Sequence, residues 1–262
     1  MAFFHFNRTL NPKIHSIRKY ENMKISNSFL AVIAFVLSSA ILSSCHMGCI
    51  EGSGKTVTEN RKITNFSKID VAGNFTINVK QDSSLSLKVS ADDNIMKYIR
   101  TEVSGNKLRI YTRKNLCSQQ PITVNLGIKS IEEVKAAGVT ELTSVGRINT
   151  QDLKLKFAGA SKINLDLSAA DLETVGSGST ELNLTGQAAS HKINISGVGE
   201  LHALNFVVGS YDIHISGSGN SQINVLKSLT THISGFSSIE YRGNPSEVDT
   251  NKSGASQVKK IQ

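Results

Sequence analysis

The stretch from Ala137 to Phe236 decides the fold. A glycine preceded by alanine or serine recurs in it six times, as Ala137-Gly138-Val139, Ala158-Gly159-Ala160, Ser177-Gly178-Ser179, Ser196-Gly197-Val198, Ser216-Gly217-Ser218 and Ser234-Gly235-Phe236. The intervals between these glycines are 21, 19, 19, 20 and 18 residues. Four positions after the glycine an apolar residue keeps the register: Leu142, Ile163, Leu182, Leu201, Ile239, and Ile223 if a two-residue insertion is allowed. A period near 20 with apolar positions in register predicts a β-solenoid whose coils bury one another.

Each coil has room for three short strands, stacked on the next coil as parallel ladders about 4.8 Å apart. The recurring glycine then supplies a tight corner with positive φ. A β-sandwich is the competing all-β architecture, but it does not explain so regular an interval. Before the repeat, alternating stretches such as residues 76–80 and 85–89 predict a strand-rich N-terminal portion, with one short helix near residues 95–99.

A family resemblance joins this N-terminal portion to the repeat. The segments Phe66 to Phe75, Val89 to Asn94 and Asn106 to Ile110, followed by the Ser-Gly repeats, resemble the auto-transporter adhesin head GIN domain family over about residues 60 to 245. The resemblance implies that the β-helix is right-handed and that the protein is exported, as is common among Bacteroidota. It implies no catalytic residues.

The N-terminus is typical of an exported lipoprotein. Lys24 precedes an apolar run from Phe29 to Leu42, and Leu42-Ser43-Ser44-Cys45 is similar to a bacterial lipobox, in which lipid is attached to the cysteine. We therefore predict a signal peptide over residues 1–44, with translation favoured to begin at Met23, and an outer-membrane protein whose surface or periplasmic side stays open. A buried N-terminal helix is the alternative. Residues 45–55 are expected to form a flexible tether, residues 56–245 the solenoid, and residues 246–262 a cap or a tail.

Charge and cysteines narrow the function further. Residues 1–44 hold five Lys or Arg and one acid, so their removal lowers the formal charge from +8 to +4. Without a basic run in the remainder, nucleic-acid binding has no support, and the membrane is contacted through the lipid.

Cys49 and Cys117 either form a disulfide or stay free thiols. The oligomeric state is left open.

Two columns of polar residues are candidate binding sites. The first contains Asn164, Asn183, His202 and, by the same insertion, Asn224. Such a column is either a stabilising hydrogen-bonded ladder or a polar face for a glycan or protein ligand. In the second column His214 and His232 both lie three residues before the glycine, with Asn194 one coil earlier. Two stacked imidazoles would be at most a weak metal pair, and an exposed polar ladder is the plainer interpretation.

Catalysis has little support in this sequence. Serines are frequent, but none lies in a nucleophile motif. The acids Asp166, Asp171, Glu173, Glu181, Glu200 and Asp212 are scattered over several columns. We therefore predict a non-enzymatic, cofactor-free envelope protein, with adhesion to glycans or proteins as its function. The alternatives are a periplasm-facing structural or envelope-stress protein and, more remotely, a polysaccharide-processing β-helix enzyme.

Overall fold

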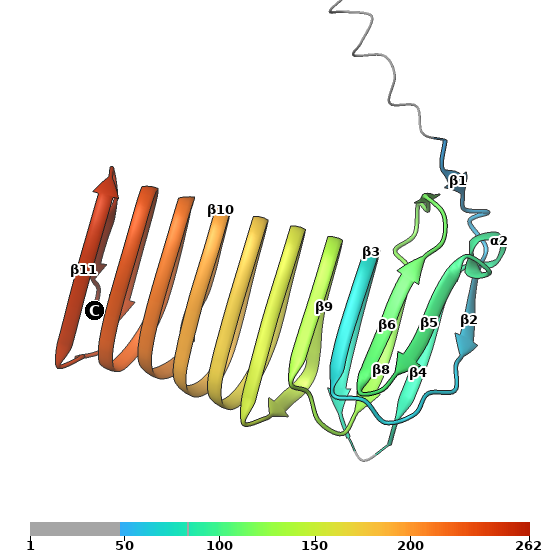
Figure 1. Cartoon of the computed structure of the whole chain (residues 1–262), viewed down its shortest axis with the longest axis horizontal. Helices are drawn as coiled ribbons and strands as arrows, with labels where there is room; N and C mark the ends of the chain where they lie inside the picture. Colours follow the sequence, from blue (N-terminus) through green and yellow to red (C-terminus); the bar gives the residue numbers. More distant parts are fainter. Residues whose placement is uncertain (1–47, 83) are drawn as a thin grey trace, which may run out of the picture. The chain divides into compact units, whose positions relative to one another are not determined.

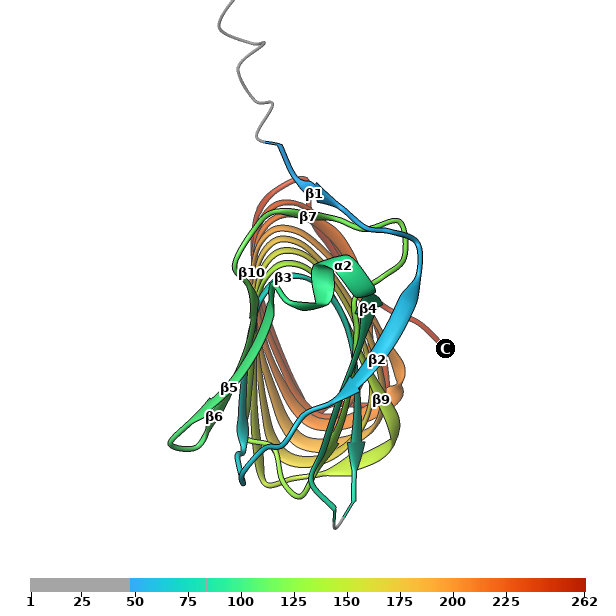
Figure 2. The same cartoon turned by 90° about the vertical axis from the view of Figure 1, so that its right-hand side faces the viewer.

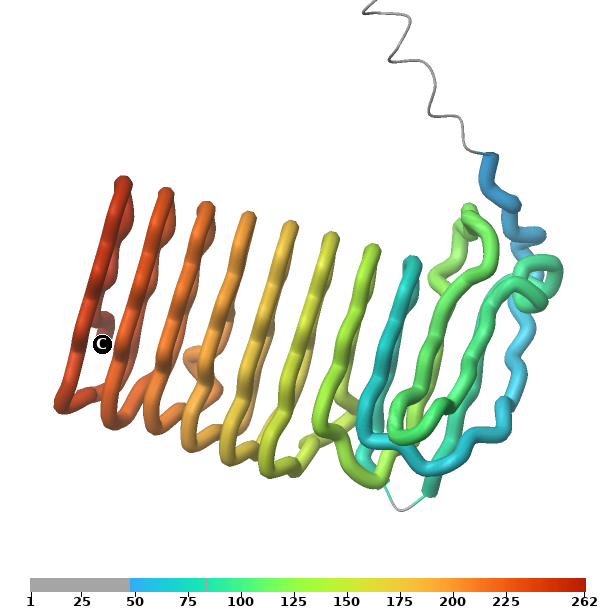
Figure 3. The backbone as a smooth tube through the Cα atoms, viewed as in Figure 1, coloured from blue at the N-terminus to red at the C-terminus, as the bar shows by residue number. Residues whose placement is uncertain are grey.

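The computed structural model describes residues 48–262 except residue 83. Nearly all of this part is β-structure, wound into a stack of flattened coils (Figures 1 and 3). The prediction of an all-β chain is confirmed. The regular coils are formed by four strands: β9 (Glu133–Asn149), β10 (Asp152–Arg242), β11 (Glu247–Gly254) and β12 (Gln257–Lys260).

The strand β10 is 91 residues long because its extended backbone continues through the corners of several coils. Neighbouring coils pair in parallel: Phe157 lies beside Ala136, and His232 lies beside Asn251. The C-terminal residues also pair in parallel with β10 and add one more turn, whose outer edge has no neighbour among the described residues.

The corner glycines lie directly on one another. A Cβ added to Gly197 would come within 2.4 Å of the carbonyl oxygen of Gly178, and the same contact recurs along the column. Every member has positive φ, for example +117° at Gly197. The column is longer than predicted, because Gly73 lies beside Gly138 and Gly254 lies above Gly235. Glycine is required here both by backbone conformation and by the close approach of the next coil.

The interior is filled by the predicted apolar columns. Leu142, Ile163, Leu182, Leu201 and Ile239 are all buried, as is Ile223. The two-residue insertion predicted before Ile223 is not found. Gly219 contacts Gly199, and Asn224 bonds to Leu204, each pair being twenty residues apart. Ser221 therefore takes the place opposite Leu201, and the coil keeps its length.

The N-terminal portion is a mixed sheet, so strand order is not parallel throughout. The strand β3 forms the first coil and pairs in parallel with β9, β8 and β6 (Figure 2). The antiparallel pairs are β4 with β8, β2 with β4, and β5 with β6. A short helix was expected near residues 95–99, but α2 ends at Met96, and Ile99 already begins the next strand. The elements here are β2 (Thr56–Asn60), β3 (Lys68–Gln81), β4 (Ser86–Asp92), α2 (Asp93–Met96), β5 (Ile99–Ser104), β6 (Lys107–Thr112) and β8 (Thr123–Ile128).

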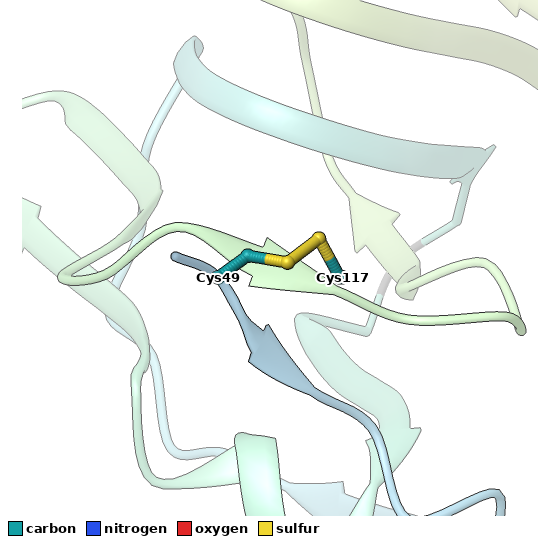
Figure 4. Close-up of a disulfide and its surroundings, with 2 residues drawn as sticks. All are labelled: Cys49 and Cys117. Atoms are coloured by element: carbon teal, nitrogen blue, oxygen red, sulfur yellow. A yellow bond between two sulfur atoms is a disulfide. The ribbon is translucent and has the colours of Figure 1, made fainter. Parts of the chain in front are cut away.

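Cys49 and Cys117 form a disulfide, with Cα atoms 5.6 Å apart (Figure 4). Beside it, β1 (Ile50–Glu51) pairs in parallel with β7 (Leu116–Cys117). The hydroxyl of Ser53 donates to Asp93, 2.6 Å away. The segment predicted to be a flexible tether is therefore attached to the domain from Cys49 onward.

The predicted signal peptide and Cys45 lie outside the described residues. In the part that is described, no helix is long and apolar enough to cross a membrane.

Candidate functional site

The first predicted column forms a hydrogen-bonded ladder. The Asn183 amide donates to the side-chain oxygen of Asn164 over 2.9 Å, and Asn164 donates to the Thr143 hydroxyl over 3.4 Å. These residues come together because parallel strands in register place equivalent positions of successive coils side by side. Much of the hydrogen-bonding capacity of these amides is thus used between coils, as expected of a stabilising ladder.

His202 continues this column, but Asn224 does not. A groove of about 480 Å³ brings His202 together with Asn164, Asn183 and Gln222. The Asn224 amide donates instead to the Leu204 carbonyl, 3.3 Å away. Gln222 was missed because the assumed insertion shifted the alignment by two residues.

An acid borders the ladder on its outer side. The Asn183 amide also donates to Glu181, and Lys162 lies 3.1 Å from the same carboxylate. These contacts, the Asn183 hydrogen bond first, lower the pKa of Glu181. The carboxylate is therefore ionised at neutral pH and balanced by Lys162.

The second predicted column forms a stack of imidazoles. The rings of His214 and His232 have centroids 4.6 Å apart and planes inclined by 22°. The Nε2 atom of His214 lies 2.8 Å from Asp212, and Lys192 lies 3.5 Å from the other oxygen of that carboxylate. This contact fixes the orientation of the His214 ring.

The stack does not favour the predicted metal pair. Imidazole lone pairs lie in the ring plane, so two stacked rings do not direct them at one point between them. Among residues 48–262 without residue 83, no three His, Cys, Asp or Glu side chains are grouped to bind a metal ion. The geometry therefore agrees with the plainer interpretation, an exposed polar ladder.

A groove of about 550 Å³ runs along this second column over five coils. Its lining contains no Asp, Glu, Lys or Arg. Two ladders border the buried isoleucines: amides and imidazoles at Asn194, His214, His232 and Asn251, and hydroxyls at Ser177, Ser196, Ser216, Ser234 and Ser253. Within the described part of the chain, the side chains of Asn194, His232 and Asn251 make no hydrogen bond.

The acids that would serve a hydrolase are each paired separately. Asp166 contacts Arg147, Glu173 contacts Lys154, and Asp171 accepts a hydrogen bond from Ser190. Each partner comes from the preceding or following coil. These pairings stabilise contacts between coils. Asp171 and Glu173 nevertheless line one groove of about 350 Å³ with Glu132 and Asp152, where Lys154 and Lys192 lie among the carboxylates.

One buried polar cluster was not predicted from the sequence. His191 is 1% exposed, and its Nε2 atom lies 3.0 Å from the Thr174 hydroxyl. The rings of Phe206 and Tyr211 pack against it, and burial lowers its pKa to about 3. Burial also raises the pKa of Tyr211. This cluster lies in the core, and its column holds Leu172 one coil earlier, which is the signal that could have placed His191 inside.

The family comparison agrees with these repeats. Residues 65–245 match the family described as "putative auto-transporter adhesin, head GIN domain". The chain belongs to this head GIN domain family. It is therefore adhesin-like by family, and the match covers all the coils up to Arg242. A search of curated proteins finds no match.

Solved structures share the head GIN fold. A "putative adhesin" from Bacteroides fragilis has a TM-score of 0.75 and 22% identity, over 81% of this chain and 100% of that one. A "putative lipid binding protein" from Parabacteroides distasonis has a TM-score of 0.66 and 20% identity, over 82% of this chain and 100% of that one. A "putative adhesin" from Parabacteroides merdae has a TM-score of 0.60 and 22% identity, over 81% of this chain and 99% of that one. At these identities the likeness concerns the fold alone.

Proposed function

We propose that this protein is a lipid-anchored, non-enzymatic adhesin of the cell envelope, and that it binds its ligand in the groove of His214 and His232. The observation that carries the proposal is a groove with no Asp, Glu, Lys or Arg in its lining, whose polar side chains repeat from coil to coil. Among the described residues the side chains of Asn194, His232 and Asn251 make no hydrogen bond, so they keep their donors and acceptors for a ligand, whereas His214 already contacts Asp212. Family membership supports the same function.

The ladder of Asn164, Asn183 and His202, continued by Gln222 in place of the predicted Asn224, is the second candidate face. It lines a groove of similar volume. We rank it below the first groove because Asn183 and Asn164 are bonded to each other, so a ligand would have to replace that bond.

The proposed anchor is lipid on Cys45, in the outer membrane. Cys49 of the disulfide lies four positions after Cys45, so the chain between them spans at most about 14 Å. The domain would therefore be held close to the bilayer by its N-terminal end. We further infer that the coils wind as a right-handed parallel β-helix, which an experimental structure would test.

Adhesion is tested with the purified mature chain on intact cells, mucin and glycan arrays, with heat-denatured protein as the background. We compare Asn194→Ala/His232→Ala with Asn183→Ala/His202→Ala. Loss of binding only in the first variant supports the first groove, and loss only in the second moves the site to the Asn164 ladder. Binding no stronger than that of denatured protein would overturn the adhesin proposal.

The second candidate function is a periplasm-facing structural protein, because the sequence leaves open on which side of the outer membrane the domain lies. Protease shaving of intact cells separates the two functions. Digestion of this protein while a periplasmic marker survives places it at the surface. Protection in intact cells but cleavage after lysis favours the periplasmic function.

A further inference from the structure

The groove of His214 and His232 has a repeat of its own. Successive coils contribute Asn194, His214, His232 and Asn251 to one ladder, each displaced from the last by one coil spacing of about 4.8 Å. The distance of 4.6 Å between the two imidazole centroids agrees with this spacing. Four equivalent polar positions therefore lie along a line of about 14 Å, parallel to the axis of the stack.

The ladder has defined ends. One coil before Asn194 its position is occupied by Val175, and before that by Lys156, which lies beside Lys135. At the other end, Asn251 belongs to the last described coil. The polar, uncharged positions thus extend over four coils and no further.

The chemistry of the lining selects a neutral ligand rich in hydroxyl groups. An amide, a neutral imidazole and a serine hydroxyl each both donate and accept hydrogen bonds, as a sugar hydroxyl does. No Asp, Glu, Lys or Arg lines the groove, and the Asp212 carboxylate beside His214 is balanced by Lys192, so neither a polyanion nor a polycation is matched by an opposite charge. The second ladder, of serine hydroxyls, offers further bonds alongside the first.

A peptide strand fits this groove less well. The groove crosses paired strands, and the backbone of Thr231 to Gly235 is already in register with Thr250 to Gly254. Strand addition is therefore open only at the outer edge of β11, at one end of the groove, and not along it. An extended peptide repeats every 3.2–3.4 Å per residue, out of step with coils about 4.8 Å apart. The length of a sugar unit in an extended glycan is close to the coil spacing.

We propose that the groove binds an unbranched neutral glycan laid along the axis of the coils, with one sugar unit on each of the four coils from Asn194 to Asn251. The proposal rests on the proposed function, since it names the ligand class of the same groove. No ligand atom is bonded covalently, and no metal takes part. Affinity comes from repetition of modest hydrogen bonds in register.

The experiment is calorimetric titration of the mature protein, in EDTA, with neutral β-1,4-linked gluco-, manno- and xylo-oligosaccharides from disaccharide to octasaccharide. In at least one series we expect the affinity to rise at least tenfold from disaccharide to tetrasaccharide and then to level off. Asn194→Ala, at one end of the ladder, should shorten the optimum by one unit and weaken tetrasaccharide binding at least threefold. The control Asn220→Ala removes an exposed amide outside the groove and should change nothing.

Two results would overturn the glycan proposal while the adhesin proposal stands. One is adhesion to cells or mucin without measurable binding of any oligosaccharide series. The other is competition for the groove by a neutral Gly-Ser peptide but not by oligosaccharides, which would assign it to protein ligands. Loss of all adhesion would instead reject the proposed function itself.

Discussion

Lys252 lies directly beside Ile233 in the parallel register of β11 with β10. In earlier coils this position holds apolar or small residues, among them Phe157, Ile195 and Ile215. The last coil thus has a charge where the others have core. An unpaired sheet edge is a template for pairing with another chain, and an inward-facing charge is a known way to prevent it.

Lys252→Ile should therefore promote self-association through the C-terminal edge. The control is Lys259→Ile, which removes the same charge from β12, one residue beyond Val258 and facing the other way. Sedimentation velocity over a range of protein concentrations should show dimers or larger species for Lys252→Ile only. Equal self-association of both variants would mean that the net charge of the protein, and not the inward position of Lys252, prevents self-association.

The repeat was predictable because each coil needs the same corner. The glycines from Gly138 to Gly235 recur at a nearly constant interval, because every stacked coil needs a glycine at its corner. The apolar columns recur at the same interval. Gly73 could not be assigned to that column from the interval alone, since 65 residues separate it from Gly138. The mixed N-terminal sheet depends on pairings distant in sequence, such as β3 with β9, which no period reveals.

Gly197→Ala should destabilise the protein more than Gly146→Ala. Both glycines have positive φ, at +117° and +83°. An alanine in that conformation lowers the free energy of unfolding by about 1–2 kcal/mol at either position. Only at Gly197 does the added Cβ meet the next coil, because nothing lies within 4 Å at Gly146. Overpacking should cost about 1–3 kcal/mol more. Urea unfolding measures the free energy of unfolding of each variant. Equal decreases for the two variants would contradict the close stacking of the corner glycines.

The site was predictable where two residues share one offset from the glycine. His214 and His232 have the same offset, and they stack as that offset requires. Asn224 was misplaced because a serine, Ser221, occupies an inward position, and a pattern based on apolar residues reads a serine there as an insertion. The hydrogen bonds of the Asn164 amide depend on the rotamer of its side chain. A rotamer cannot be read directly from the sequence.

Acid should weaken the protein through His191. Its pKa is about 3 in the folded state and about 6.5 when exposed, so the unfolded chain binds the proton first. The contribution of neutral His191 to the free energy of unfolding is fully present above pH 6.5. It is lost as the pH decreases toward 3, by about 1.4 kcal/mol per pH unit in the steep part. His191→Leu, which matches Leu172 in the same column, should flatten this slope between pH 6.5 and 5. Parallel slopes for the two proteins would show that other groups cause the acid sensitivity.

Removal of the Cys49–Cys117 disulfide should destabilise the N-terminal end. The bond closes a separation of 68 residues, which in the chain-entropy account corresponds to about 4 kcal/mol. Cys49→Ser, Cys117→Ser and the double variant should all lose the same amount, because each breaks the same bond. Limited proteolysis should then cut faster near Gly52, where the two-residue pairing of β1 with β7, the Ser53 contacts and the hydrogen bond from Asn94 to the Glu51 carbonyl remain. Faster cutting with an unchanged free energy of unfolding would mean that the bond fastens the N-terminal segment without stabilising the coils, and its effect would then be limited to the proposed membrane tether.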